Sequence, residues 1–135
     1  MGDHTLFFVY GTLMQYSGRM NAFSPKAQYL NDILIEGYRL YSLGGFPGLT
    51  RGGPGDYVKG ELWRVPNSDI PKLDRYESEG YLYLRQQIND DDGDEPIYAY
   101  IYNHDTSSHT RIESGDWLAY QAKRPLPAAY STGAD

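Results

Sequence analysis

The feature that most restricts the fold of this chain is an apolar segment at residues 6–9 that ends in a glycine turn at Gly11. Bulky and β-branched side chains favour a buried strand. Glycine lets the backbone approach a ligand closely because no Cβ atom stands in the way, and N–H groups freed at a strand end can bind a small anion. The segment predicts one of two things: a strand that simply turns, or one wall of a ligand pocket.

The composition restricts the classes of partner. A chain of 135 residues fits one domain, which we expect to span 1–135, with a core at 5–122 and a loosely ordered tail at 123–135. The formal net charge of -6 disfavours nucleic acid as a partner, because binding to a phosphate backbone depends on clustered Lys and Arg. The 14 tyrosines suit cavity walls that are apolar along the ring and polar at the tip, which favours a small polar ligand.

Several kinds of site are disfavoured. The chain has no cysteine, which excludes a disulfide framework, a thiolate nucleophile and a thiolate metal site. The acidic segment at 90–94 predicts a solvated hairpin turn, since Ile88 stands where a calcium loop needs an oxygen ligand. The histidines lack metal-ligand spacing, and we expect no metal or other cofactor. The apolar run at 6–9 is too short for a signal peptide or a membrane span, so a cytoplasmic protein is expected.

Strand and helix patterns alternate in a way typical of a mixed fold. Period-two patterns predict strands at 29–43, 56–65, 81–89 and 95–103. Ser24-Pro25 predicts the start of a short helix or a turn. Capping residues and prolines predict helices after 67–69 and at 117–123. Gly60 weakens its predicted strand unless another backbone or a ligand comes close to it.

One acidic side chain falls on the apolar face of the helix predicted after 67–69. Ile70, Leu73 and Glu77 follow the i, i+3, i+7 spacing, so they share one face. Burial disfavours a charged carboxylate and raises its pKa from the ordinary value of about 4.3 toward neutrality, where a glutamate can transfer protons. The alternative is that Glu77, at the end of the helix, faces water or pairs with Arg75 or Arg85.

Four sequence blocks carry a resemblance to a known family. They are FVYGTL at 8–13, FPGL at 46–49 with VKGELW at 58–63, LDRYE at 73–77 with Tyr83 and Arg85, and SGDW at 114–117. In this order they are similar to the gamma-glutamylcyclotransferase-like superfamily, in particular to the branch that includes gamma-glutamylamine cyclotransferase. The resemblance implies an α+β fold, a compact mixed β-barrel with short flanking helices.

The resemblance also implies a site. The glutamate of the family's Leu-Asp-x-x-Glu block is the catalytic acid/base, and it maps onto Glu77. The family's Tyr-Gly-x-Leu turn holds the gamma-glutamyl part of the substrate, and it maps onto Tyr10, Gly11, Thr12 and Leu13. We expect Tyr83, Tyr100 or Arg85 to complete the substrate-binding pocket; the alternative is that the tyrosines serve packing and that Arg85 neutralises nearby acids. Many relatives place Gly directly after the glutamate, whereas Ser78 follows it here.

The implied activity is release of 5-oxoproline and a free amine from a gamma-glutamyl amine or peptide, by attack of the substrate's α-amine on its γ-carbonyl. The expected partner is therefore a small-molecule gamma-glutamyl substrate, with no nucleic acid or membrane, and the chain is expected to be a monomer or small homo-oligomer. An alternative is a non-catalytic binding module for a small amino-acid-like or acidic metabolite, in which Glu77 pairs with a ligand amine. The third hypothesis is a purely structural or interaction protein, which leaves the glycine turn at the strand end and the carboxylate on the apolar helix face without a role.

Overall fold

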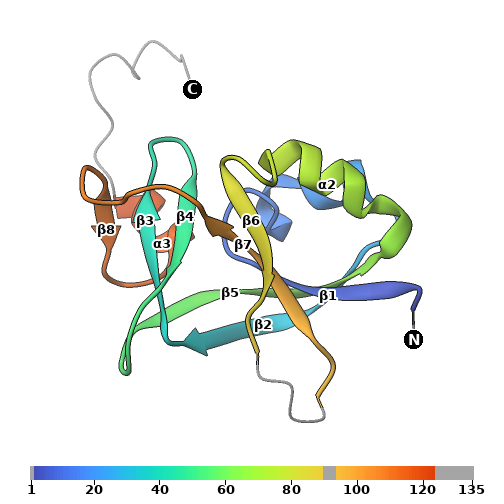
Figure 1. The fold of residues 1–135 in the computed structure, drawn as a ribbon, viewed down its shortest axis with the longest axis horizontal. Helices are drawn as coiled ribbons and strands as arrows, with labels where there is room; N and C mark the ends of the chain where they lie inside the picture. The colour runs from blue at the N-terminus through green and yellow to red at the C-terminus, as the bar shows by residue number, and fades with distance from the viewer. Residues whose placement is uncertain (1, 90–93, 124–135) are drawn as a thin grey trace.

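The structure is a computed structural model that describes residues 2–89 and 94–123. It consists of one mixed sheet with short helices packed against it (Figure 1). The strands are β1 (His4–Val9), β2 (Gln28–Glu36), β3 (Tyr38–Ser42), β4 (Pro47–Arg51), β5 (Tyr57–Pro66), β6 (Tyr83–Gln87), β7 (Ile97–Tyr102) and β8 (Thr110–Ile112). The helices are α1 (Arg19–Phe23), α2 (Ile70–Glu77) and α3 (Trp117–Lys123), with short 3-10 turns η1 (Gln15–Ser17) and η2 (Asn67–Asp69). The predicted α+β class is confirmed.

The strand order explains the shape of the sheet. The order is β2-β5-β1-β7-β4-β3-β8, and β6 pairs with the other edge of β7. Strand β1 pairs with Ile97 and Tyr98 of β7, and β4 pairs with Ile101, both in parallel orientation. Two strands therefore follow one another along a single edge of β7, and the sheet divides there. Figure 1 shows β1, β2 and β5 running across the view, while β3, β4 and β8 run nearly upright.

The expected barrel is not shown. Within the described residues no strand pairing joins β2 to β8, the two ends of the sheet order. The division at β7 turns the two halves of the sheet in different directions, which accounts for an open arrangement. The observed fold is therefore an eight-stranded mixed sheet with short helices.

The core lies along β1, which confirms the first predicted strand. Phe7 and Phe8 of β1 are at most 1% exposed. A strand that is paired on both edges and covered on both faces is apolar throughout rather than alternating. The helices contribute Met20, Leu73 and Trp117 to the same core, and each of these side chains is at most 1% exposed. Burial of these side chains fixes the helices on the sheet.

Some predicted boundaries were wrong. The strand expected at 29–43 is two strands, because Gly37 takes a φ of +91° and turns the chain between β2 and β3. At Ser24-Pro25, where the sequence left a helix start or a turn open, the structure has a turn: helix α1 ends before Ser24, and the Ala27 amide donates to the Ser24 carbonyl at 3.0 Å. Strand β8 has three residues, too few to show a period in the sequence, and it forms by pairing with β3.

Other expectations stand as follows. Strands β6 and β7 pair antiparallel as predicted, while the tip of their hairpin at 90–93 lies outside the described residues. The same holds for the expected loose tail from 124 onward. The close approach expected at Gly60 is confirmed, since a Cβ atom there would lie 2.4 Å from the carbonyl oxygen of Val9. The single-domain assignment stays a prediction.

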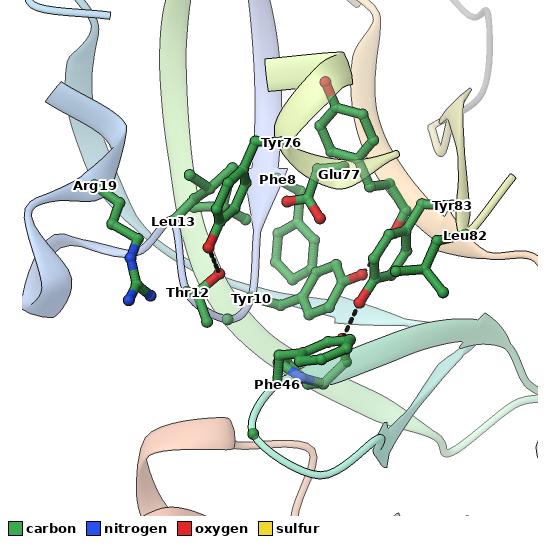
Figure 2. Close-up of a pocket in the computed structure, with 15 residues that line it drawn as sticks. Phe8, Tyr10, Thr12, Leu13, Arg19, Phe46, Tyr76, Glu77, Leu82 and Tyr83 are labelled. Atoms are coloured by element: carbon green, nitrogen blue, oxygen red, sulfur yellow. Dashed lines mark hydrogen bonds between the residues drawn. The ribbon is translucent and has the colours of Figure 1, made fainter. Parts of the chain in front are cut away.

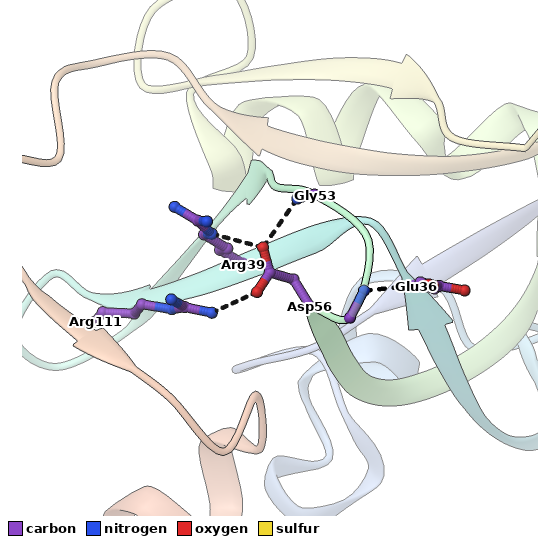
Figure 3. A network of polar contacts seen from close by, with 6 residues as sticks. Glu36, Arg39, Gly53, Asp56 and Arg111 are labelled. Atoms are coloured by element: carbon purple, nitrogen blue, oxygen red, sulfur yellow. Dashed lines mark hydrogen bonds and ion pairs between the residues drawn. The ribbon is translucent and has the colours of Figure 1, made fainter.

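A charged network joins β3, β8 and the loop before β5 (Figure 3). The carboxylate of Asp56 accepts hydrogen bonds from Arg39 Nε at 2.7 Å, from Arg111 Nη2 at 2.8 Å and from the Gly53 amide at 2.8 Å. The Gly53 amide and the two guanidinium groups lower the pKa of Asp56 from 3.8 to about 2. This carboxylate therefore anchors the short β8 to the rest of the sheet.

We expect Asp56→Asn to lower the free energy of unfolding at neutral pH. The folded-state pKa of Asp56 lies below its unfolded value, so its stabilisation is present above about pH 4 and is lost as the pH falls toward 2. The stability difference between the native chain and the variant should therefore shrink over this range, as measured by urea unfolding at a series of pH values. The control is Asp3→Asn, since no side-chain bond to Asp3 exists among the described residues; an Asp56→Asn difference that does not change with pH would contradict the assignment.

Candidate active site

The division of the sheet creates the site. The pairing of β1 with β7 ends at Phe7, opposite Tyr98, and β4 pairs with the same strand at Leu49, opposite Ile101. In the gap, the hydroxyl of Tyr10 donates a hydrogen bond to the carbonyl oxygen of Tyr100 at 2.6 Å. The hydroxyl of Tyr83 donates to the carbonyl oxygen of Pro47 at 2.6 Å. These two phenols satisfy backbone acceptors that a continuous sheet would have bonded to a neighbouring strand.

Gly11 has a packing role at this junction. A Cβ atom at Gly11 would lie 2.5 Å from Cγ of Pro47, so the absence of a side chain makes room for the proline ring. The turn closes with a hydrogen bond from the Met14 amide to the Gly11 carbonyl at 3.0 Å. Close packing of β1 and β4 at this point depends on that glycine.

A cavity of about 460 Å³ opens at the junction (Figure 2). This volume is within the range of pockets that hold small molecules, roughly 300–1,000 Å³. The lining residues come from the end of β1 and its turn, the loop before β4, α2 and the β6–β7 pair. They are Phe8, Val9, Tyr10, Gly11, Thr12, Leu13, Arg19, Gly45, Phe46, Pro47, Tyr76, Glu77, Leu82, Tyr83 and Tyr100.

The turn after β1 presents free backbone donors. Within residues 2–89 and 94–123, no acceptor bonds the amide N–H groups of Gly11, Thr12 or Leu13. The hydroxyls of Thr12 and Tyr76 lie 2.8 Å apart in a hydrogen bond that ties the turn to α2. Consecutive free amides can bind negative charge on a ligand. The prediction that the first strand ends in donors beside a pocket agrees with this geometry.

Glu77 projects from the last turn of α2 into the same cavity. Figure 2 shows its carboxylate directed into the space bounded by Phe8, Tyr10 and Tyr83. The residue is only partly exposed, through the mouth of the cavity. Among the described residues nothing donates a hydrogen bond to this carboxylate or forms an ion pair with it. Burial raises the pKa of Glu77 from 4.5 to about 7, so the group can both take up and release a proton near neutral pH.

Arg85 does not neutralise Glu77, because Asp74 engages it. The guanidinium of Arg85 bonds both carboxylate oxygens of Asp74 at 2.9 Å, and the hydroxyl of Tyr100 donates to Asp74 at 2.7 Å. Burial pushes the pKa of Asp74 upward, but the hydrogen bonds from Arg85 and Tyr100 outweigh it and leave the pKa below its usual value. The pairing of Glu77 with Arg75 or Arg85 that the sequence left open is therefore not what the structure shows.

The phenols around Glu77 are held in their protonated form. Burial, followed by the neighbouring charge of Glu77, raises the pKa of Tyr83. Burial is also the largest cause of the raised pKa of Tyr10, to which Tyr83 and Glu77 add. Both hydroxyls donate to backbone carbonyls, so they shape the wall of the cavity and Glu77 remains its readily titrating group.

A buried glutamate that the sequence analysis did not single out holds the turn after β1. Glu61 of β5 lies opposite Val9 in the β1–β5 register. Its carboxylate accepts hydrogen bonds from the Gln15 amide at 2.9 Å and from the Trp63 indole at 3.0 Å. One residue thus holds both ends of the turn, through its backbone at Val9 and its side chain at Gln15. The VKGELW block contains Glu61, but nothing in its spacing indicates this contact.

The residue after Glu77 adopts an unusual backbone conformation. Ser78 ends α2 with φ 53° and ψ 51°, in the left-handed region that favours glycine. The amide of Ser78 donates back to the helix, as in an ordinary helix C-terminus. Ser78 therefore holds a conformation that glycine adopts without steric cost, and α2 directs Glu77 into the cavity.

The structure brings together most of the predicted site residues. Tyr10, Gly11, Thr12, Leu13, Tyr83 and Glu77 all line the one cavity. Arg85 is not among the lining residues and lies in its pair with Asp74. The lining residues that the sequence analysis did not assign to the site include Arg19, Phe46 and Tyr76, although Phe46 and Tyr76 stand in its quoted sequence blocks.

Comparisons with known proteins agree with this geometry. Residues 7–119 match the model of the family described as gamma-glutamyl cyclotransferase, AIG2-like. The chain belongs to this family. It is 38% identical over 111 residues to the gamma-glutamylcyclotransferase family protein YtfP of Escherichia coli (strain K12), covering 82% of this chain and 94% of that protein.

Solved structures of family members resemble the fold. The solution NMR structure of ytfP from Escherichia coli superposes with a TM-score of 0.66 at 35% identity, covering 87% of this chain and 99% of that one. A structure named gamma-glutamyl cyclotransferase has a TM-score of 0.58 at 21% identity, covering 81% of this chain and 70% of that one. This second likeness shows the fold alone.

Two further findings concern residues 2–89 and 94–123 of this chain. No helix there is both long and apolar enough to cross a membrane. No three His, Asp or Glu side chains there are grouped as for a metal ion.

We expect the stability of this family member to depend on pH through Glu77. Its pKa rises from 4.5 in the unfolded chain to about 7 in the fold, so between these values the folded protein holds a proton that the unfolded chain has lost. The free energy of unfolding should therefore fall as the pH rises through this range, by about 1 kcal/mol per pH unit. Glu77→Gln cannot ionise, so it should lose this dependence and exceed the native stability above pH 7.

Urea unfolding of the native chain and the variant from about pH 5 to about pH 8 measures this difference. The control is Glu113→Gln, which removes an exposed carboxylate outside the cavity. Equal pH slopes in the native chain and in Glu77→Gln would show that the carboxyl is solvated in the fold.

We expect Ser78→Gly to raise the free energy of unfolding by about 1 kcal/mol, because glycine adopts the left-handed conformation without the steric cost that serine has there. Thermal or urea unfolding measures the change. Ser68→Gly is the matched control: Ser68 is exposed and, unlike Ser78, does not have a positive φ, so it should gain nothing. An equal change in stability at both positions would show that the gain does not come from the left-handed conformation of Ser78.

Proposed function

We propose that this protein is a gamma-glutamylcyclotransferase that releases 5-oxoproline and a free amine from a gamma-glutamyl amine or peptide. One observation carries the proposal: an unpaired carboxyl with a pKa of about 7 faces a 460 Å³ cavity that is also lined by three consecutive residues whose amides have no partner among the described residues. The family membership and this arrangement support the same chemistry. The assignment to the gamma-glutamylamine branch is part of this proposal.

The reaction needs proton transfer and a folded substrate. The nitrogen of the substrate's α-amine attacks its γ-carbonyl carbon, and the new N–C bond closes a five-membered lactam. Glu77 accepts the proton that the α-amine loses and donates it to the leaving nitrogen as the original amide C–N bond breaks. Atoms balance without a co-reactant, and the tethered nucleophile makes orientation the main contribution of the cavity.

The turn after β1 would bind the negative charge of the glutamyl half. The N–H groups of Gly11, Thr12 and Leu13 are donors for the α-carboxylate and for the oxyanion that forms at the γ-carbon. Two hydrogen bonds hold this turn before substrate binds: the Gln15 amide donates to Glu61, and the hydroxyls of Thr12 and Tyr76 bond each other. Donors fixed in advance do not need to reorganise during the reaction.

We expect Glu77→Gln to lower kcat for 5-oxoproline release by at least about 100-fold, since general acid–base groups contribute roughly 10²–10⁴. In the native protein kcat/KM should rise with pH and level off above neutrality, with a midpoint near pH 7, because the base must be unprotonated. The measurement is 5-oxoproline by mass spectrometry, with a panel of gamma-glutamyl amines and peptides.

Glu113→Gln serves as the control, and it should turn over at the native rate because Glu113 lies outside the cavity. Undiminished release by Glu77→Gln would remove the proton-transfer role of this residue. Saturable binding of a gamma-glutamyl compound by the native protein, without any 5-oxoproline, would instead support the non-catalytic binding module.

A further inference from the structure

The cavity has a second charged residue, which the proposed reaction does not use. Of the described residues that line the cavity, only Glu77 and Arg19 carry a charge. Arg19 is the first residue of α1 and is exposed at the rim. In a chain with a formal net charge of -6, a cation at the mouth of the site is a specific local feature.

Arg19 is free to bind a ligand. Other arginines are occupied: Arg39 and Arg111 pair with Asp56, and Arg85 pairs with Asp74. For Arg19, the described part of the chain supplies neither a carboxylate partner nor a side-chain hydrogen bond to its guanidinium. A guanidinium at the entrance of a cavity matches the planar geometry of a carboxylate.

The position of Arg19 separates it from the reacting atoms. Figure 2 shows the hydrogen-bonded pair of Thr12 and Tyr76 between Arg19 and Glu77. In the proposed reaction the α-amine and γ-carbonyl lie at Glu77, and the amides of the turn bind the negative charge of the glutamyl half. The part of the substrate that extends from the γ-carbonyl toward the rim is the leaving half, and this half can reach Arg19.

Resting on the proposed function, we infer that Arg19 is a specificity-determining residue that binds a carboxylate on the leaving half of the substrate. Within the proposed branch, the preferred substrates are then gamma-glutamyl compounds whose leaving amine carries a carboxylate close to the scissile nitrogen, ahead of those whose leaving amine has none. Arg19 takes no part in proton transfer. Its attraction acts across a solvent-exposed rim, so salt weakens it.

The test uses two substrates that differ by one carboxylate, gamma-glutamylalanine and gamma-glutamylethylamine. Arg19→Gln should lower kcat/KM for gamma-glutamylalanine by about tenfold, the loss of one charge-assisted contact, and leave kcat/KM for gamma-glutamylethylamine unchanged. Arg19→Lys should retain part of the preference, and added salt should reduce the preference in the native protein but not in Arg19→Gln. The matched control is Arg75→Gln, another exposed arginine that does not line the cavity.

The outcomes separate this inference from the proposed function. An equal loss of kcat/KM for both substrates in Arg19→Gln would show that Arg19 binds the glutamyl half. No loss for either substrate would show that Arg19 does not contribute to recognition. Both results overturn the inference and leave the proposed reaction intact. Absence of 5-oxoproline from every substrate with the native protein would overturn the proposed function, and the inference with it.

Discussion

The site depends on one constraint, that β1 and β4 share a single edge of β7. A backbone edge can pair with only one strand at each residue, so β1 has to leave at the point where β4 begins. Among the described residues, the three amides of the turn after β1 have no partner, and the hydroxyl of Tyr10 donates to the carbonyl that is left at Tyr100. The cavity is thus a consequence of the sheet topology. Gly11 lets Pro47 close the junction, which keeps the two halves of the sheet in contact.

The second requirement is a carboxyl without a counter-charge. Asp74 and Glu77 lie three residues apart on α2, and a single arginine from β6 reaches one of them. Because Arg85 and Tyr100 both bond Asp74, Glu77 faces the cavity with burial as the dominant influence on its pKa. The same ion pair fixes α2 against β6 and β7. The Arg85–Asp74 pair therefore leaves the carboxyl of Glu77 without a counter-charge in the part of the chain that the structure describes.

The sequence predicted the elements that have strong local signals. The apolar run of β1, the helix after 67–69 and the shared face of Leu73 and Glu77 appear in the structure as expected. The break at Gly37 and the three-residue β8 were missed, because one depends on a single backbone angle and the other on pairing with a distant strand. The closed barrel implied by the family resemblance is not shown, since strand pairing along β7 is a long-range property that no local pattern contains.

The amino-acid sequence by itself determined the family, the α+β class and the acid that stands on an apolar helix face, because ordered motifs and helical periodicity are local. Only the tertiary structure decided which charges meet. It paired Arg85 with Asp74, left Glu77 alone and set Arg19 at the rim of the same cavity. These contacts join residues far apart in the chain, and their energies depend on burial and distance, which arise only when the sheet has assembled.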